Sequence, residues 1–254
     1  PVRALVMDYT DDTETWGIDD EYMLGDSLLV APIADTDPDE REKRKELFED
    51  FNLGRYFERY EDFHVPYWET NVDLWTRYAA GQISRDTLIV ERFRRPLSKG
   101  HGLEDVSVKF CLEVSDHFLD LCANKPGVID GAHELMQYLQ SRGYRLHMCS
   151  NGFHEVQYRK LRASNMLQYF QTIILSEDAG VNKPAKEYFD YALEKTGAKR
   201  ESTLMIGDNF QTDILGAKHA GLDVMWFNPS PESKQATEPI TYEVAALKDI
   251  MNIL

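Results

Sequence analysis

From about residue 127 to the C-terminus, short apolar runs alternate with helical patterns, and this alternation limits the folds open to the chain. It predicts strands at 144–149, 172–175, 203–206 and 223–227. The intervening patterns predict one helix capped by Asp130 and ended by Gly143, further helices at 154–163 and 184–196, and another that ends at Gly221. Strands and helices in this order favour an α/β fold with a doubly wound parallel sheet over residues 126–254. A polar loop at 228–240 precedes an expected last helix.

Residues 38–125 read as helical throughout, which predicts a separate all-helical cap. Aromatic residues recur there at three- and four-residue spacing and are expected to form the helical core: Phe48, Phe51, Tyr56, Phe57, Tyr60, Phe63, Tyr67, Trp68, Trp75 and Tyr78. An all-helical block placed before an α/β block suggests a lid.

Residues 1–37 form an atypical N-terminal segment that fits neither pattern, and a core strand supplied by this segment is left open. Residues 3–7 are strand-like, residues 8–22 are rich in acids, and residues 27–33 form a second apolar run. Pro32 interrupts that run and argues against a regular central strand there, because proline cannot donate to a strand ladder.

Composition narrows the functional classes. The formal net charge of −16 would repel a nucleic-acid backbone, so a nucleic-acid polymer is not an expected partner. The longest apolar run, 28–33, is far too short to span a membrane, and no basic-then-apolar signal pattern opens the chain; we therefore expect a cytoplasmic protein. Cys111, Cys122 and Cys149 lack metal-ligand spacing and read as reduced core thiols. A monomer and a homodimer both remain open.

Three groups of polar residues follow the predicted strands. The triplet Ser150-Asn151-Gly152 offers a hydroxyl and backbone N–H groups that suit an anion. Lys183 precedes a helix and offers a cation, and Gly207-Asp208-Asn209 with Asp213 offers two carboxylates that suit Mg²⁺. Because ligands of a doubly wound sheet bind beyond the carboxyl ends of its strands, these groups together predict a phosphoryl site.

Each group also has a purely structural interpretation. The triplet is compatible with an ordinary turn, Lys183 with a solvated surface residue, and Asp213 with a charge facing a helix dipole. The order of the groups at successive strand ends favours the functional interpretation.

The segments MCSNGF, NKP and LMIGDNFQTDILGAKHAG resemble motifs II, III and IV of the haloacid dehalogenase superfamily, most of whose members are Mg²⁺-dependent phosphatases. The resemblance runs from about residue 41 to residue 254 and is greatest to the pyrimidine 5′-nucleotidase subgroup with a helical cap. Phrases such as GRYFERYEDF, ERFRRPL and ILSEDAGVNKP are typical of that subgroup. The resemblance implies a Rossmann-like core and a small phosphate ester, a nucleoside 5′-monophosphate, as substrate.

The resemblance also implies a role for each site residue. Ser150 would donate a hydrogen bond to the transferred phosphoryl group, and Asn151 with Gly152 would help shape its nest. Lys183 would neutralise charge on the phosphoryl group and the nucleophile. Asp208 would bind Mg²⁺, and Asp213 would support the metal site.

The family's reaction requires motif I, a strand ending in Asp-x-Asp-x-Thr whose first Asp is the nucleophile and whose second is the acid/base. Residues 28–32, where it is expected, read Leu-Leu-Val-Ala-Pro. Asp8 is one nucleophile candidate, but the next acid of its segment stands three residues away, on the opposite face of an extended chain. Asp35 has the right Asp-x-Asp spacing but follows Pro32 and lacks the threonine. Solvated loop carboxylates are the alternative for both.

Residues 1–33 instead resemble a stretch near the end of the catalytic barrel of the glycoside hydrolase family 31 α-glucosidases and α-xylosidases. The catalytic-aspartate segments of that family are absent, so this piece cannot supply a glycosidase site. The chain therefore resembles a phosphatase whose first strand was replaced by a glycosidase fragment.

Two hypotheses follow. The first is a Mg²⁺-dependent phosphohydrolase that forms an aspartyl-phosphate. The second is a phosphate-binding pseudo-enzyme or fusion product that lacks a nucleophile. A true dehalogenase is disfavoured, because Asp208 and Asp213 suit a metal that halide displacement does not require.

Overall fold

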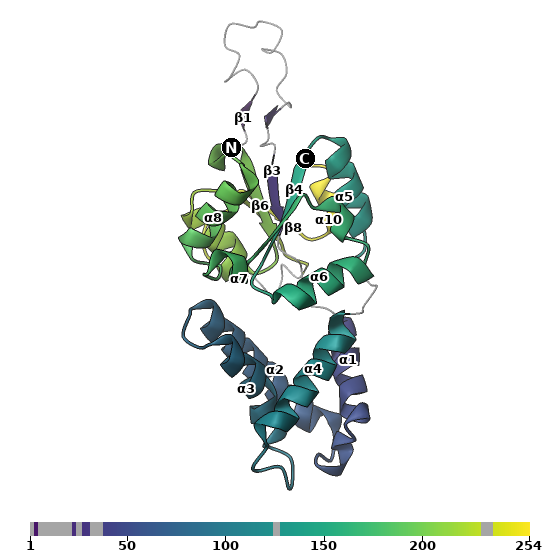
Figure 1. Ribbon diagram of the computed structural model, residues 1–254. Helices are drawn as coiled ribbons and strands as arrows, with labels where there is room; N and C mark the ends of the chain where they lie inside the picture. Colours follow the sequence, from purple (N-terminus) through teal and green to yellow (C-terminus); the bar gives the residue numbers. More distant parts are fainter. Residues whose placement is uncertain (1–2, 5–21, 24–26, 31–37, 124–127, 230–235) are drawn as a thin grey trace, which may run out of the picture. The chain divides into compact units, whose positions relative to one another are not determined.

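The computed structural model describes residues 3–4, 22–23, 27–30, 38–123, 128–229 and 236–254 of the chain. Two compact units are present (Figure 1). The sheet unit comprises Pro1–Asp35, Val128–Asn151 and Met166–Leu254, and the helical unit comprises Thr36–Gly127 and Gly152–Asn165. The chain thus leaves and re-enters the sheet unit twice.

The sheet unit is built on six strands in the order β5-β4-β3-β6-β7-β8. Every neighbouring pair is parallel, which confirms the predicted doubly wound α/β fold. The strands are β3 (Ser27–Val30), β4 (Arg145–Ser150), β5 (Thr172–Leu175), β6 (Thr203–Gly207), β7 (Asp223–Phe227) and β8 (Tyr242–Val244).

Helices cover both faces of this sheet (Figure 1). On one face, α5 (Ala132–Ser141) and α10 (Leu247–Ile250) bury their apolar residues against Leu28, Leu146 and Leu204. On the other face, α8 (Lys186–Thr196), the π-helix η6 (Phe210–Leu215) and α9 (Gly216–His219) pack over Leu29, Cys149 and Met205. Both faces are therefore dry, which explains why the strands read as nearly continuous apolar runs.

Pro32 argues against a regular central strand in the apolar run 27–33, and this expectation is wrong, whereas the open alternative of a core strand from the N-terminal segment is confirmed. β3 lies between β4 and β6, with Val30 opposite both Met148 and Ile206. The strand has four residues and ends two positions before Pro32, so the ladder does not need the N–H that proline lacks. The N-terminal segment therefore contributes a central strand of the sheet.

Most other local boundaries agree with the sequence prediction. β5, β7 and α6 (His154–Ala163) span the predicted residues. The predicted Asp130 cap is wrong: the position before α5 is Gly131, in the left-handed region at φ 79°, and no side chain caps the helix. β8 was not predicted, because three residues are too few to show a period.

The helical unit contains α1 (Pro38–Asp50), α2 (Tyr60–Ala79), α3 (Arg85–Leu97), α4 (Val108–Ala123) and α6. Its main core includes the predicted aromatics Phe57, Phe63 and Tyr67. A second cluster joins Phe153, just before α6, to Leu74 and Leu88. Trp68 does not belong to the core, because its position faces outward and 37% of its surface is exposed.

The remaining described helices are short: η3 (Leu53–Arg55), η4 (Leu167–Tyr169), η5 (Arg200–Ser202) and α7 (Ser176–Ala179). β1 (Arg3–Ala4) and β2 (Tyr22–Met23) form a small antiparallel pair. The three cysteines are buried and none of them is in a disulfide bond, as expected. Among the described helices, none has the length and apolar character needed to cross a membrane.

Candidate active site

The polar residues predicted from the sequence lie at the carboxyl edge of the sheet, on both sides of β3. β4 and β5 extend the sheet from one side of β3, and β6, β7 and β8 extend it from the other. Ser150 is the last residue of β4 and Gly207 the last of β6. Ligands of doubly wound sheets bind at such a switch point, because the connecting loops separate there.

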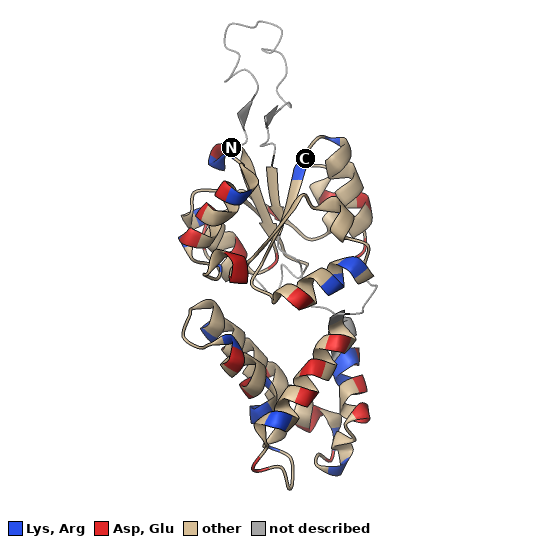
Figure 2. Ribbon diagram, viewed as in Figure 1, with Lys and Arg blue, Asp and Glu red and all other residues tan. Residues whose placement is uncertain are grey.

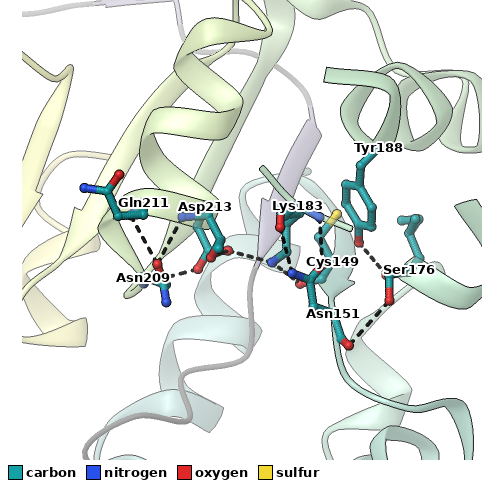
Figure 3. A network of polar contacts seen from close by, with 10 residues as sticks. Cys149, Asn151, Ser176, Lys183, Tyr188, Asn209, Gln211 and Asp213 are labelled. Atoms are coloured by element: carbon teal, nitrogen blue, oxygen red, sulfur yellow. Dashed lines mark hydrogen bonds and ion pairs between the residues drawn. The ribbon is translucent and has the colours of Figure 1, made fainter. Parts of the chain in front are cut away.

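Lys183 is the cation of this edge, and it is a buried residue rather than a solvated one. Only 3% of its surface is exposed. Its Nζ lies 2.6 Å from Oδ1 of Asp213 and donates to the carbonyl oxygen of Cys149 at 3.0 Å (Figure 3). The ammonium is thus compensated by a carboxylate and a backbone dipole, as a buried charge requires.

Asn151 follows Ser150 and contacts the backbone of Lys183 twice. Its Nδ2 donates to the carbonyl oxygen of Lys183 at 2.9 Å, and its Oδ1 accepts from the backbone N–H of Lys183 at 2.8 Å. Figure 3 shows Lys183 between Asp213 on one side and Asn151 with Cys149 on the other. The next residue, Gly152, begins the segment that belongs to the helical unit.

Asp213 lies on η6 and uses both carboxylate oxygens. Besides Lys183, its Oδ1 accepts from the hydroxyl of Thr212 at 3.2 Å, and its Oδ2 accepts from the backbone N–H of Asn209 at 3.2 Å. Asn209 in turn caps η6, since its Oδ1 accepts from the N–H groups of Gln211 and Thr212. Asp213 therefore holds the cation and the loop after β6 together.

Gly207 permits this arrangement. A Cβ atom added to Gly207 would lie 2.6 Å from Oδ2 of Asp213 and 2.7 Å from its Cβ. Gly216 allows a similar approach on the other side of the loop, because an added Cβ would lie 2.8 Å from Cα of Pro184. Neither close approach had a sequence signal, although the cap formed by Asn209 was recognisable as an Asn before a helix.

The two other titratable groups beside Lys183 are neutral. Burial raises the pKa of the Cys149 thiol to about 11. Burial also raises the pKa of the Tyr188 phenol well above its usual value, and that hydroxyl donates to the carbonyl oxygen of Ile174 at 2.7 Å. Among the described side chains beside Lys183, Asp213 is therefore the one that carries the opposite charge.

The described carboxylates account for only part of the ligand set of a Mg²⁺ site. Asp208 follows β6 and is partly exposed, whereas Asp213 is engaged with Lys183. In the described ranges, no three His, Cys, Asp or Glu side chains are grouped as a metal site. Mg²⁺ commonly takes one or two protein carboxylates and fills its other positions with water and phosphate oxygens, so Asp208 fits as one ligand. Asp8 and Asp35 lie outside the described residues.

The sequence profile of the haloacid dehalogenase-like hydrolases matches residues 31–221. The chain belongs to this family. HAD-hydrolase YfnB of Bacillus subtilis is 34% identical over 209 residues, which cover 82% of this chain and 85% of YfnB. A crystal structure of YfnB bound to magnesium matches with a TM-score of 0.78 and 31% identity, covering 91% of this chain and 99% of that chain.

Other members of the family are also similar to this haloacid dehalogenase-like chain. Pyrimidine 5′-nucleotidase PynA of Streptococcus pneumoniae is 31% identical over 196 residues, 77% of this chain and 79% of PynA. The L-2-haloacid dehalogenase of Xanthobacter autotrophicus shares only the fold, with a TM-score of 0.68, 15% identity, and coverage of 91% of this chain and 98% of that chain. The family match begins at residue 31, so β3, at the centre of the sheet, lies just outside it.

Proposed function

We propose that this haloacid dehalogenase-like hydrolase removes the phosphate from a small phosphate monoester, most specifically a nucleoside 5′-monophosphate. The observation that carries the proposal is the buried Lys183 ammonium, held by Asp213 and Cys149 at the switch point of the sheet and tied to the residue after Ser150. A buried cation held at the end of the strand that carries Ser150 suits a phosphoryl group.

The chemistry of each side chain supports this assignment. An ammonium has three N–H donors, and in the described chain the ammonium of Lys183 donates to two acceptors, Asp213 and the carbonyl oxygen of Cys149. The third donor is available to a phosphoryl oxygen or to the attacking carboxylate. The hydroxyl of Ser150, at the end of β4, donates to a second phosphoryl oxygen. Both hydrogen bonds stabilise the negative charge of the transferred phosphoryl group.

Asp208 is the residue that would hold Mg²⁺. A bound Mg²⁺ supplies charge neutralisation at the phosphoryl oxygens. Asp213 supports the site through its contacts with the Lys183 ammonium and with the backbone N–H of Asn209, in the loop that carries Asp208.

Turnover requires an aspartate nucleophile. One of its oxygens attacks phosphorus, the bond from phosphorus to the ester oxygen breaks, and the leaving alkoxide takes a proton from an acid. Water then attacks the acyl phosphate, which releases inorganic phosphate and restores the carboxylate. We propose Asp8 or Asp35 for this role.

The nucleotide preference rests on relatives. PynA of Streptococcus pneumoniae and YjjG of Escherichia coli are pyrimidine 5′-nucleotidases, and YjjG is 28% identical over 209 residues. Their similarity extends over at least three quarters of this chain, which supports a nucleoside 5′-monophosphate as the first substrate to test.

The decisive experiment is phosphate release from a panel of nucleoside monophosphates with Mg²⁺. We expect Lys183→Met to lower kcat by about 100- to 1000-fold. Asp208→Asn should abolish the Mg²⁺-dependent rate, and a chelator should do the same until Mg²⁺ is restored. The control is Asp190→Asn, which alters an exposed ion pair with Lys186. A wild-type rate no higher than that of Asp208→Asn on every substrate would refute the proposal.

The same assay identifies the nucleophile. Asp8→Asn and Asp35→Asn are measured beside the wild type, and we expect one of them to lose turnover while retaining binding of inorganic phosphate. Full activity in both variants would exclude both candidates.

The second candidate function is phosphate binding without turnover. It is favoured by β3, whose residues Ser27–Val30 end without a carboxylate where the family's nucleophile strand is expected to carry one. In that case calorimetry would detect inorganic phosphate binding that Lys183→Met weakens, while no substrate in the panel would be hydrolysed.

A further inference from the structure

The side chain of Asn151 pairs with the backbone of a single residue of the opposite loop. Its amide donates to the carbonyl oxygen and accepts from the N–H of the same residue, Lys183, at 2.9 and 2.8 Å. Both are short, direct bonds. A side-chain amide used in this way takes the place that a neighbouring strand would occupy, and it fixes both the position and the orientation of the Lys183 backbone.

The ammonium end of Lys183 is fixed from the same strand. Its Nζ donates to the carbonyl oxygen of Cys149, two residues before Asn151, and pairs with Asp213. The end of β4 therefore holds Lys183 at both its backbone and its side-chain terminus. Ser150 stands between Cys149 and Asn151 in the sequence, so the segment that carries the Ser150 hydroxyl also holds Lys183 in position.

We infer that the side chain of Asn151 is a positioning residue that sets the Lys183 ammonium relative to Ser150, and that it acts through Lys183 rather than through its own contact with the substrate. This inference rests on the proposed function. The motif resemblance assigned Asn151 to the phosphate nest, whereas the hydrogen bonds assign its side chain to the lysine loop.

The test is a double-mutant cycle with Asn151→Ala, Lys183→Met and the double variant, measured as kcat and KM for a nucleoside monophosphate with Mg²⁺. Residues that act through one another are not additive. We expect Asn151→Ala to lower kcat/KM by about 10- to 100-fold, as is typical of a residue that orients a functional group. In the Lys183→Met background, the same substitution should change it by less than about twofold.

A near-isosteric variant supplies a second readout. In Asn151→Asp, one carboxylate oxygen still accepts from the Lys183 N–H, while the other faces the Lys183 carbonyl oxygen and repels it. Protonation restores a donor at that position, so the activity of Asn151→Asp relative to wild type should rise as the pH is lowered toward the carboxyl pKa. Ser176→Ala is the matched control, because the Ser176 hydroxyl donates to the backbone carbonyl oxygen of Asn151, at 3.4 Å, and not to its side chain. We expect it to stay within about twofold of wild type.

The outcomes separate the inference from the proposed function. If Asn151→Ala lowers kcat/KM by the same factor in the wild-type and Lys183→Met backgrounds, the Asn151 side chain acts independently of Lys183. That result overturns the inference and leaves the proposed function in place. If Lys183→Met equals wild type, the function itself fails and the inference with it. If the wild type binds phosphate without turnover, the cycle is measured on the Kd of inorganic phosphate, with the same expected coupling.

Discussion

At the scale of single residues, the Lys183–Asp213 pair is the feature on which the sheet edge depends. Both side chains are 4% exposed, and their charged atoms lie 2.6 Å apart. Removing one partner of a buried pair leaves the other charge uncompensated. We therefore expect Asp213→Asn to lower the free energy of unfolding by about 3 kcal/mol, measured by chemical denaturation.

Asp190 provides the comparison on the protein surface. It pairs with Lys186 and Arg200, and all three side chains are at least 36% exposed. Exposed pairs contribute at most about 1 kcal/mol, because water and salt screen them. Equal losses in Asp213→Asn and Asp190→Asn would contradict the assignment of Asp213 to a buried pair.

His147 is a second buried titratable residue, in the middle of β4. It is 2% exposed, and in the described chain neither ring nitrogen has a hydrogen-bond partner. Burial, with a smaller effect of the nearby Arg145 charge, lowers its pKa to about 4. The folded protein thus keeps the ring neutral at pH values where the unfolded chain is protonated.

The pH dependence follows from this difference. Stability from the neutral ring is complete above pH 6.5 and is lost as the pH falls toward 4, because only the unfolded state then binds the proton. Because of His147, we expect the free energy of unfolding to fall by about 2 kcal/mol between pH 7 and pH 5. His147→Leu should show a correspondingly flatter loss in denaturation curves, whereas the exposed His101→Gln should follow wild type. If the free energy of unfolding of His147→Leu depends on pH as steeply as that of the wild type, the prediction is refuted.

At the scale of elements, the end of β6 requires a glycine. A methyl group at Gly207 would overlap the Asp213 carboxylate, so Gly207→Ala must displace either the strand end or η6. We expect a loss of about 1–3 kcal/mol in the free energy of unfolding and a fall in activity, because Lys183 loses its fixed partner.

Gly54 is the matched control for that substitution. Its added Cβ would meet only Phe48, at an ordinary contact distance of 3.8 Å. Gly54→Ala should leave stability unchanged or slightly higher, since alanine restricts the unfolded chain more than glycine does. A loss as large as that of Gly207→Ala would show that the backbone, and not Asp213, is the cause.

Elements with a strong local pattern could be predicted from the sequence. The bounds of α6, β5 and β7 agree with the prediction, because hydrophobic periodicity and end signals are properties of neighbouring residues. β3 could not be placed that way. Its four residues are held by pairing with β4 and β6, which lie more than 100 residues further along the chain.

At the scale of the whole molecule, charge is the dominant property. The chain has 44 acidic and 28 basic residues, a formal net charge of −16. Figure 2 shows acidic residues on helices of both units, while the strands of the sheet are almost entirely uncharged. Like charges spread over the helices repel one another and oppose compact folding.

Salt should therefore stabilise the protein. We expect the Tm to rise by about 2–4 °C between 20 mM and 300 mM NaCl, corresponding to about 1 kcal/mol of screened repulsion. Differential scanning fluorimetry in NaCl and in choline chloride separates screening from specific ion binding. A Tm that stays constant or falls in both salts would contradict a repulsive charge distribution.

Local patterns and residue types are enough to predict the alternating strands and helices, the acidic charge and the polar residues at the strand ends. The central position of β3, the pairing of Asp213 with Lys183 and the contacts of Asn151 with the lysine loop depend on tertiary contacts. Those features are hydrogen bonds and ion pairs between residues at least 30 positions apart, and no short-range period encodes such a pairing.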